Sequence, residues 1–341
     1  MKTKLAINGF GRIGRNIFRA WIESGRKDLE IVAINDLAPV EMQAHLLQFD
    51  SVHGRLNLPV QYGENWLQVG KHRIRCGSER NPEELEWHDV DVTLECTGFF
   101  TAREAAARHL KNGSSRVLVS APSKGADKTI VYGVNHRSLE SSDLVVSNAS
   151  CTTNCLAPIA MVLDQHIGIE NGYMTTIHSY TGDQPTLDTN HADPYRARAA
   201  AMSMIPTSTG AARAVGLVLP NLQGKLDGSA IRVPTPNVSV VDLSFTTSRD
   251  TNVDEINDLF AEASQKELVD ILDISRSPLV SSDFNHIPYS SIVAANETKV
   301  LDERFVRVLS WYDNEWGFSN RMLDTAAFFD RVVKGNTSIA A

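Results

Sequence analysis

The chain has 341 residues, of which 42% are hydrophobic and four are cysteines, and its net charge is −8. This length predicts two domains with cores that need no disulfide bonds, and the negative charge argues against a general nucleic-acid partner. No apolar stretch approaches the roughly 18 residues of a membrane-spanning helix, no signal-peptide pattern is visible, and the cysteines form no C-x-x-C pair, so we expect a cytoplasmic protein without a structural zinc site or other metal.

The first 150 residues alternate between strand-like and helix-like segments. Helices are expected at 12–25, ending at Gly25, and at 102–113. Strands are expected at 4–8, 30–36, 91–98, 116–122 and 143–150. This alternation predicts an α/β fold, namely a doubly wound, Rossmann-like domain with a mostly parallel sheet.

A glycine motif, G-x-G-x-x-G at residues 9–14, lies between the first predicted strand and the first helix. Gly9 permits a tight turn, Gly11 allows a pyrophosphate to approach the backbone, and Gly14 lets the helix pack on the strand. Asp36 ends the second strand, 22 residues after Gly14. Its carboxylate could accept hydrogen bonds from a ribose and repel a 2′-phosphate, which favours NAD over NADP; the alternative is an ordinary strand-end cap.

Cys151 lies where a strand-like run passes into a helix-like run, in SNASCTTNCLAPI at 147–159. The N–H groups and dipole at a helix N-terminus stabilise a thiolate over a thiol, and a thiolate is the nucleophile of covalent catalysis. The alternative is a buried structural cysteine. Cys155, one helical turn later, could form a disulfide bond with Cys151 after oxidation, but we expect a packed side chain, as for Cys76 and Cys96.

A base and an anion site are predicted near this thiol. His178 follows Cys151 by 27 residues in a strand-like segment, and a neutral imidazole could take the thiol proton, although spacing alone does not select it over His166 or His191. Hydroxyls, arginine forks and backbone N–H groups suit a phosphate, although each residue could instead serve a turn or a salt bridge. These candidates are Ser150, Thr152, Thr181, Arg196, Arg198, Thr209, Gly210 and Arg232.

After Cys151 the pattern changes to period-2 strands at 172–181, 229–248, 291–301 and 304–314. This predicts an α+β domain with a mostly antiparallel sheet and a boundary near residue 150. The stretch 319–333 is an amphipathic helix that the pattern assigns to neither domain, and a flexible tail is expected at 334–341.

The chain resembles the phosphorylating glyceraldehyde-3-phosphate dehydrogenases, NAD-dependent glycolytic enzymes of bacterial type. The resemblance covers roughly residues 3–330. It rests on NGFGRIGRN (8–16), ASCTTNCLAP (149–158), HSYTGDQ (178–184), RARAAA (196–201), IPTSTGAA (205–212), RVPTPN (232–237) and WYDNEWGFSNRM (311–322).

The resemblance implies roles for individual residues. Cys151 would be the nucleophile and His178 its base. Inorganic phosphate would bind at Ser150, Thr152, Thr209 and Gly210, and the anionic substrate at Thr181, Arg196 and Arg232. NAD would contact the three glycines, Arg12 and Ile13 at the pyrophosphate, Asp36 at the ribose, Arg80 at the adenine, and Ser120 and Asn314 around the nicotinamide.

The resemblance also implies an NAD-binding domain at 1–150, with helix 316–333 packed back on it, and a catalytic and tetramerisation domain at 151–315. Such enzymes are homotetramers, and the 180–205 loop reaches a neighbour's cofactor. One departure is Thr189-Asn190, where many NAD-specific members have Leu-Pro, which weakens the expected exclusion of NADP.

The implied reaction oxidises D-glyceraldehyde 3-phosphate to 1,3-bisphosphoglycerate with NAD and inorganic phosphate, through a hemithioacetal and a thioester on Cys151. The nearest alternative is erythrose-4-phosphate dehydrogenase, in which the thioester is hydrolysed. SYTGDQ and the TSTG at 207–210 keep phosphate-binding hydroxyls and favour the phosphorylating enzyme. A non-catalytic binding protein and an aspartate-semialdehyde dehydrogenase fit the sequence less well, because the thiol, its base and the C-terminal WYDNEWG are all present.

Overall fold

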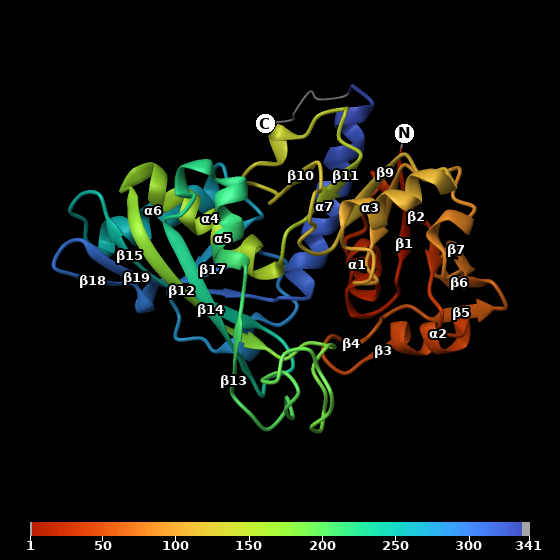
Figure 1. The fold of residues 1–341 in the computed structure, drawn as a ribbon, viewed down its shortest axis with the longest axis horizontal. Helices are drawn as coiled ribbons and strands as arrows, with labels where there is room; N and C mark the ends of the chain where they lie inside the picture. The colour runs from red at the N-terminus through yellow and green to blue at the C-terminus, as the bar shows by residue number, and fades with distance from the viewer. Residues whose placement is uncertain (1, 336–341) are drawn as a thin grey trace. The chain divides into compact units, whose positions relative to one another are not determined.

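The computed structural model describes residues 2–335, and Figure 1 follows them as a ribbon. The described chain forms two compact units. The first unit takes the residues up to Ile130, His136–Ala149 and those from Ser319 onward, and the second takes Val131–Asn135 and Ser150–Phe318. The expected tail at 334–341 lies largely outside the described residues.

The first unit is built on a nine-stranded sheet, ordered β10-β11-β9-β8-β1-β2-β7-β6-β5. The strands from β10 to β7 pair in parallel, and only β6 and β5 pair antiparallel at one edge. The fold class is therefore confirmed for this unit. The strands are β1 (Thr3–Asn8), β2 (Leu29–Asn35), β5 (Val60–Gly63), β6 (Trp66–Val69), β7 (His72–Gly77), β8 (Val92–Glu95), β9 (Arg116–Val119), β10 (Lys128–Thr129) and β11 (Val145–Ser147).

Of the two helices predicted in the first unit, one is present as expected and the other differs in form, and α2 was not predicted. Helix α1 (Arg12–Ser24) ends at Gly25, whose φ of 62° is the left-handed cap that glycine adopts most easily. The helix expected at 102–113 is instead α3 (Arg103–Ala106) followed by the 3₁₀ helix η2 (Ala107–Asn112). The other elements are α2 (Val40–Gln48), the hairpin β3 (Phe49–Asp50) and β4 (Gly54–Arg55), η1 (Pro82–Glu84) and η3 (His136–Ser138).

Helix α7 (Trp316–Val333) begins in the second unit and continues in the first. In the first unit it is tied to strand ends by buried hydrogen bonds. The Thr3 hydroxyl donates to Asp330 over 2.5 Å, and the Thr325 hydroxyl donates to the Asn148 side chain over 2.8 Å. These bonds hold the last described helix beside β1 and the segment after β11.

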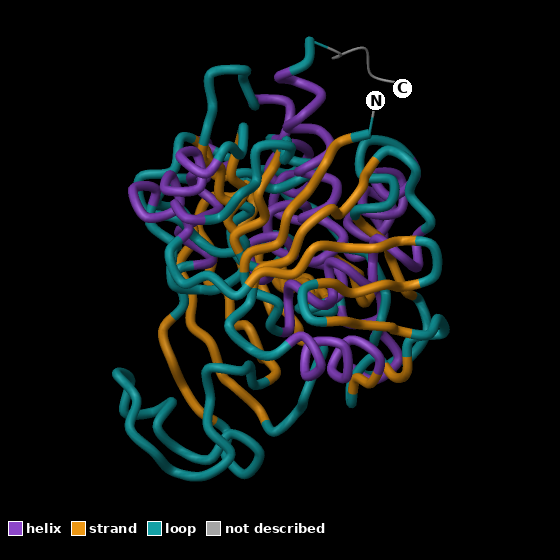
Figure 2. Tube along the Cα trace, turned by 90° about the vertical axis from the view of Figure 1, so that its right-hand side faces the viewer, coloured by secondary structure: helices purple, strands orange, loops and turns teal. Residues whose placement is uncertain are grey.

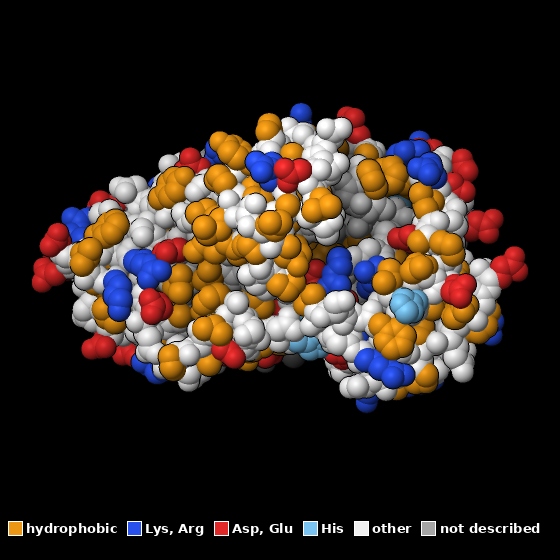
Figure 3. Space-filling model, turned by 90° about the horizontal axis from the view of Figure 1, so that it is seen from below, with side chains coloured by type: hydrophobic (Ala, Val, Ile, Leu, Met, Phe, Trp, Pro, Cys, Tyr) orange, Lys and Arg blue, Asp and Glu red, His pale blue; other side chains and the backbone are white. Residues whose placement is uncertain are grey.

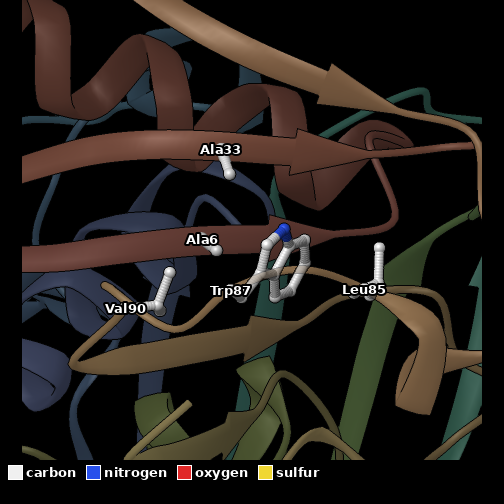
Figure 4. Packing of buried hydrophobic residues seen from close by; sticks show 5 residues of the cluster. All are labelled: Ala6, Ala33, Leu85, Trp87 and Val90. Carbon is white, nitrogen blue, oxygen red and sulfur yellow. The ribbon is translucent and has the colours of Figure 1, made fainter. Parts of the chain in front are cut away.

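Apolar side chains fill the space beside the sheet of the first unit. In one cluster Leu85, Trp87 and Val90 pack with Ala6 of β1 and Ala33 of β2. Figure 4 shows the Trp87 ring in front of β1 near Ala6, with Ala33 on the neighbouring strand, where the small alanine side chains leave room for the ring. Burying a large aromatic ring in this way contributes a substantial part of the hydrophobic stabilisation.

The second unit contains an eight-stranded sheet, ordered β13-β14-β12-β15-β19-β17-β16, with β18 paired to β19. It is mostly antiparallel, as expected, but β12 pairs in parallel with β14, and β16 with β17. The strands are β12 (Ile169–Ser179), β13 (Ile205–Ser208), β14 (Leu226–Val233), β15 (Ser239–Thr247), β16 (Leu272–Ser275), β17 (Ser291–Ala294), β18 (Lys299–Leu301) and β19 (Phe305–Tyr312).

Two of the long strands expected in this unit are interrupted. The run at 229–248 divides into β14 and β15 around Pro234 and Pro236, which cannot donate backbone hydrogen bonds to a sheet. The run at 291–301 divides into β17 and β18 around the 3₁₀ helix η6 (Ala295–Glu297). A period-2 pattern does not by itself reveal such breaks.

The helices of the second unit include α4, one of the most buried segments of the chain. Twelve of the sixteen residues of α4 (Cys151–His166) are buried, in keeping with its apolar sequence. The other helices are α5 (Ala211–Val218), α6 (Val253–Gln265), η4 (Pro220–Leu222) and η5 (Ser281–Phe284). Figure 2 shows a long loop, drawn in teal, which joins β12 to β13. Among residues 2–335, no helix is long and apolar enough to cross a membrane, and no cluster of three potential metal ligands occurs.

Candidate active site

A pocket of about 440 Å³ lies in the first unit, where the C-terminal ends of β1, β2 and β8 adjoin. In doubly wound sheets this edge is where nucleotides bind. The pocket is lined by Asn8, Gly9, Gly11, Asn35, Asp36, Leu37, Glu79, Arg80, Cys96, Thr97, Phe99 and Phe100. It therefore brings together Gly9, Gly11, Asp36 and Arg80 of the predicted NAD contacts.

Two of the three motif glycines have no room for a side chain, and the third leaves open space at the start of α1. A Cβ on Gly9, whose φ is 91°, would lie 2.6 Å from the backbone nitrogen of Thr97, and a Cβ on Gly14 would lie 2.2 Å from the carbonyl oxygen of Gly9. Gly11 has no atom within 4 Å of its ideal Cβ position, and it caps α1 without a side-chain hydrogen bond. The N-terminus of α1 can thus be approached closely by a pyrophosphate, so the residues fit a dinucleotide.

Asp36 directly follows β2, and its carboxylate is oriented by two backbone groups. Oδ2 accepts from the Phe10 N–H over 2.7 Å, and Oδ1 accepts from the Ala38 N–H over 2.9 Å. Each oxygen of a carboxylate has two lone pairs, so both can still accept a further hydrogen bond. The strand-end cap and the ribose contact are therefore compatible roles.

The remaining cofactor candidates of the first unit lie around this pocket rather than in its wall. Arg12 and Ile13 open α1, and the Arg12 guanidinium pairs with Asp50 over 2.6 Å, an interaction that the motif does not reveal. Ser120 follows β9, and its side chain is hydrogen-bonded to Cys96 of the pocket wall. Ser120 therefore contacts the wall of the pocket through Cys96 but does not itself line the pocket.

In the second unit, Cys151 is the first residue of α4. The preceding Ala149 has a φ of 57°, a left-handed conformation that is costly for a residue with a side chain. Ser150 is the N-cap, and its hydroxyl oxygen accepts from the Thr153 N–H over 3.1 Å. This sharp turn directs the Cys151 side chain at the start of the helix, and strain of this kind is found at functional sites.

His178 lies near the end of β12 with its Nε2 atom 3.5 Å from the Cys151 sulfur. Its Nδ1 atom is 2.7 Å from the Ser179 carbonyl oxygen. Arg232 Nη1 is 3.0 Å from Nδ1, but it also donates to the Ser179 carbonyl and, over 3.1 Å, to the Thr181 hydroxyl, which accounts for both of its protons. The proton on Nδ1 is therefore assigned to the bond with Ser179, which leaves Nε2 free to accept the thiol proton.

The electrostatics of the pair correct one expectation. Burial raises the pKa of the Cys151 thiol, and the Arg232 charge and the Thr152 hydrogen bonds only partly oppose this, so the predicted lowering at the helix N-terminus does not dominate. Burial and then Arg232 lower the pKa of His178 to about 3, which favours a neutral imidazole. Proton transfer from thiol to imidazole would, however, create opposite charges that attract each other across the 3.5 Å contact.

A buried tyrosine supports the nucleophile's helix. The Tyr312 hydroxyl lies 2.9 Å from the hydroxyls of both Thr152 and Thr176. Burial raises the pKa of Tyr312, so its hydroxyl keeps its proton and can donate to one of the two threonines. The predicted phosphate ligand Thr152 is therefore engaged with β12 and β19 through this tyrosine, and sequence reasoning missed Tyr312.

Arginines gather beside His178 because of strand register. Arg232 of β14 is the parallel partner of His178. Arg196 Nη1 donates to Asp183 over 3.1 Å, and its Nε donates to the Thr207 hydroxyl over 3.1 Å. Thr181 accepts from Arg232 and donates to Asp183. The predicted substrate contacts Thr181, Arg196 and Arg232 thus form one hydrogen-bonded group, which is joined by Asp183.

Thr209 and Gly210 lie at the start of α5. Gly210 is its N-cap, and the Thr209 hydroxyl oxygen accepts from the Ala211 N–H over 3.2 Å. The Thr153 hydroxyl of α4 donates to the Ala211 carbonyl over 3.5 Å. The N-termini of α4 and α5 therefore lie side by side, and two such ends are suited to an anion.

Asn314 follows β19, and two buried hydroxyls fix its amide. Ser179 Oγ and Ser239 Oγ donate to Asn314 Oδ1 over 2.9 and 2.8 Å, and Ser239 Oγ accepts from the Ser179 N–H over 3.0 Å. The amide nitrogen is then the part that Asn314 can offer to a ligand. The two serines lie 135 and 75 residues from Asn314, so no local motif could indicate them.

Other candidates lie away from the thiol or have different surroundings. His166 is exposed at the end of α4, and His191 accepts from the Asp193 N–H. Arg198 pairs with Asp188 at the surface. Cys155 is a free, buried thiol 3.6 Å from the Ser291 hydroxyl, and burial raises its pKa to about 12, which agrees with the packed role.

Comparisons with known proteins agree with this geometry. Residues 3–103 match the family model described as the NAD binding domain of glyceraldehyde 3-phosphate dehydrogenase, and residues 150–314 match its C-terminal domain. The chain is 64% identical to glyceraldehyde-3-phosphate dehydrogenase of Cereibacter sphaeroides over 98% of this chain and 100% of that protein. It is 63% identical to the Xanthobacter flavus protein of the same name and 53% identical to that of Geobacillus stearothermophilus, each over 96% of this chain and 98% of the relative. The chain therefore belongs to the glyceraldehyde-3-phosphate dehydrogenase family and is an NAD-dependent oxidoreductase.

Proposed function

We propose that this enzyme oxidises D-glyceraldehyde 3-phosphate to 1,3-bisphosphoglycerate with NAD and inorganic phosphate, through an acyl thioester on Cys151. The observation that carries the proposal is the 3.5 Å contact between the Cys151 sulfur and His178 Nε2, with the imidazole oriented as a proton acceptor. A thiol with an oriented base is the arrangement that covalent catalysis by cysteine needs.

The first half of the reaction uses these two side chains alone. As the sulfur of Cys151 adds to the aldehyde carbon, His178 takes the thiol proton and then gives it to the new alkoxide, which forms a hemithioacetal. His178 next removes the hydroxyl proton, while NAD, when bound, would supply the acceptor for the hydride that leaves this carbon. The carbonyl re-forms as a thioester on Cys151, which retains much of the free energy of oxidation.

The second half requires an anion to reach the thioester. Phosphate oxygen attacks the thioester carbon, the C–S bond breaks, and the acyl phosphate leaves while Cys151 recovers its proton from the imidazolium of His178. We assign the attacking phosphate to the adjoining N-termini of α4 and α5, with Ser150, Thr152, Thr209 and Gly210. The substrate's own phosphate is assigned to Thr181, Arg196 and Arg232, because an arginine fork matches phosphate oxygens.

NAD is proposed to bind the pocket of the first unit. Gly9, Gly11 and Gly14 with the first residues of α1, Arg12 and Ile13, would hold the pyrophosphate. Asp36 would hold the adenosine ribose and Arg80 would flank the adenine, while Ser120 and the Asn314 amide nitrogen would serve the nicotinamide end. This assigns cofactor binding to 1–150 with helix 316–333, and catalysis and tetramerisation to 151–315.

We also propose that the enzyme is a homotetramer. Large apolar side chains are exposed on the loop between β12 and β13, where Leu187, Met202 and Met204 are 73, 79 and 76% exposed. Figure 3 shows many hydrophobic side chains, in orange, among the charged ones on one face of the molecule. Large apolar side chains exposed close together in the sequence, as these three are, support an interface at this loop. Analytical ultracentrifugation should give four times the mass of one chain, and Met202→Asp with Met204→Asp should reduce it; a monomer at assay concentration would contradict this proposal.

The reaction is tested by parallel assays of NADH formation. Glyceraldehyde 3-phosphate and erythrose 4-phosphate are each supplied with and without inorganic phosphate. We expect the first aldehyde to be preferred, phosphate to accelerate steady-state turnover, and mass spectrometry of a phosphate-free reaction to detect an acyl adduct on Cys151. Phosphate-independent turnover with erythrose 4-phosphate, or the absence of any adduct, would overturn the proposal.

A further inference from the structure

A row of buried polar side chains joins the ends of neighbouring strands in the first unit. Asn8 of β1 donates from Nδ2 to Oε2 of Glu95, the last residue of β8, over 2.7 Å. Asn35, the last residue of β2, donates from Nδ2 to Asn8 Oδ1 over 2.8 Å and accepts at Oδ1 from the Glu79 N–H over 2.7 Å. The row therefore runs from β8 across β1 and β2 to the segment after β7.

Glu95 is the fixed end of this row, because four hydrogen bonds meet on its carboxylate. Oε2 is bonded to Asn8 and lies 2.8 Å from His109 Nε2, while Oε1 accepts from the Thr97 N–H over 2.9 Å and from the Thr97 hydroxyl. Glu95 is 1% exposed and His109 is 0% exposed. A carboxylate without solvent is tolerated only when its oxygens are hydrogen-bonded, so each of these donors is required.

His109 is held in one orientation. Asn112 Oδ1 accepts from the Ser114 N–H over 3.1 Å and from the Ser114 hydroxyl over 2.8 Å, which turns the Asn112 amide nitrogen toward His109 Nδ1 at 3.2 Å. Nδ1 is thus the acceptor, and Nε2 carries the proton that is donated to Glu95. The Trp87 ring stacks on the imidazole at 5.7 Å with an interplanar angle of 4°.

Two bonded partners of Glu95, Asn8 and Thr97, form part of the dinucleotide pocket together with Asn35, whereas Glu95 and His109 do not line it. The Thr97 backbone nitrogen is also the atom that a Cβ on Gly9 would meet at 2.6 Å, so its position sets the space for the motif turn. We infer that Glu95 and His109 are positioning residues for the adenosine half of NAD, acting through Thr97, Asn8 and Asn35. This inference rests on the pocket assigned in the proposed function.

The inference is tested by Glu95→Gln, which replaces one acceptor oxygen by an NH2 group that must face another donor. Isothermal titration calorimetry of the intact enzyme, without substrate, should show the dissociation constants of NAD and of ADP-ribose rising together by about 10- to 100-fold, as when a supporting partner of a binding group is removed. The kcat at saturating NAD should change much less than KM for NAD. Equal losses with ADP-ribose, which lacks only the nicotinamide, exclude the nicotinamide as the part affected, and equal losses with AMP assign the effect to the adenosine half.

A second pair of variants examines His109. Glutamine carries an amide N–H near the position of Nε2, so His109→Gln should keep much of the NAD affinity that His109→Leu loses. This pair decides the matter if Glu95→Gln does not fold. Equal NAD affinity in His109→Gln and His109→Leu would overturn the inference.

Thr3→Val is the matched control. Thr3 begins β1 at the opposite end of the strand from Asn8, is buried, and donates a 2.5 Å hydrogen bond to Asp330, but it does not line the pocket. This variant should lower the melting temperature and leave the NAD dissociation constant unchanged. An equal loss of NAD affinity would mean that Glu95 contributes only to stability.

A comparison with Asp36→Ala distinguishes the inference from the pocket assignment. If Asp36→Ala weakens NAD binding and Glu95→Gln does not, the inference fails while the pocket assignment stands. If neither variant weakens NAD binding, the pocket assignment fails too.

Discussion

The two units prepare for their ligands in different ways. The pocket of the first unit is lined by glycines, asparagines and apolar side chains together with a few charged groups, of which the Asp36 carboxylate is held by backbone donors. The site of the second unit instead places a thiol, an imidazole and a guanidinium side by side, with Cys151, His178 and Arg232 in contact or nearly so. Shape and hydrogen bonding suffice to bind a cofactor, whereas chemistry requires groups whose protonation can change.

The variant expected to distinguish the two units most strongly is Cys151→Ser. The serine hydroxyl is a far weaker nucleophile, so turnover should fall by at least about 10⁴-fold, as when a catalytic nucleophile is removed elsewhere. Because the pocket of the first unit is untouched, the NAD dissociation constant measured by calorimetry should stay unchanged. Cys155→Ser, in the same helix but bonded to Ser291, is the control and should remain active. Full activity of Cys151→Ser would remove the basis of the proposed mechanism.

A pH profile gives the next largest effect. The Arg232 charge lowers the pKa of both Cys151 and His178, so Arg232→Gln should raise both. A higher thiol pKa means less thiolate at a given pH, and the pH midpoint of Cys151 alkylation by iodoacetamide should move upward by on the order of one unit.

The control for this profile is Arg198→Gln, because Arg198 is paired with Asp188 on the surface of the same unit. His178→Asn should also move the midpoint upward, since it removes the group that accepts the thiol proton. A downward shift in Arg232→Gln would contradict the electrostatic reading of the site.

The smallest expected effect lies in the first unit, at Asp36. Asp36→Ala removes a hydrogen-bonding partner of the ribose and the charge that would repel a 2′-phosphate. The ratio of kcat/KM for NAD to that for NADP should fall by roughly tenfold or more, which corresponds to the loss of one or two charged hydrogen bonds. Asp89→Ala, a surface carboxylate paired with Arg75, is the control. An unchanged ratio would mean that Asp36 serves only as a strand-end cap.

Features that depend on a few neighbouring residues could be predicted from the sequence, whereas features that depend on distant residues could not. The turn at Gly9 and the helix start at Cys151 are set by a few adjacent residues, and both lie where they were expected. The choice of His178 over His191 could not be derived from spacing, because it depends on β12 ending beside the N-terminus of α4. The family resemblance supplied that choice, and the 3.5 Å contact is its geometric counterpart.

The supporting groups were missed for the same reason. Tyr312 meets Thr152 across 160 residues, and Asn8 meets Glu95 across 87. Such pairs arise from the order of strands in a sheet, which hydrophobic periodicity does not encode. The direction in which the Cys151 pKa is shifted could not be predicted from the sequence either, because burial of the thiol depends on the packing of the whole unit.

The left-handed backbone at Ala149 has a consequence for anyone who would engineer this enzyme. Glycine there would relieve the strain, and this gain outweighs the added freedom of the denatured chain, because a residue with a side chain at positive φ costs more than that freedom. A screen for heat tolerance would score the exchange as an improvement. The Cys151 side chain, however, would be held less firmly in its reactive orientation, so the loss would appear only in the kinetics. Melting temperatures would therefore be a poor guide to activity for substitutions at residue 149.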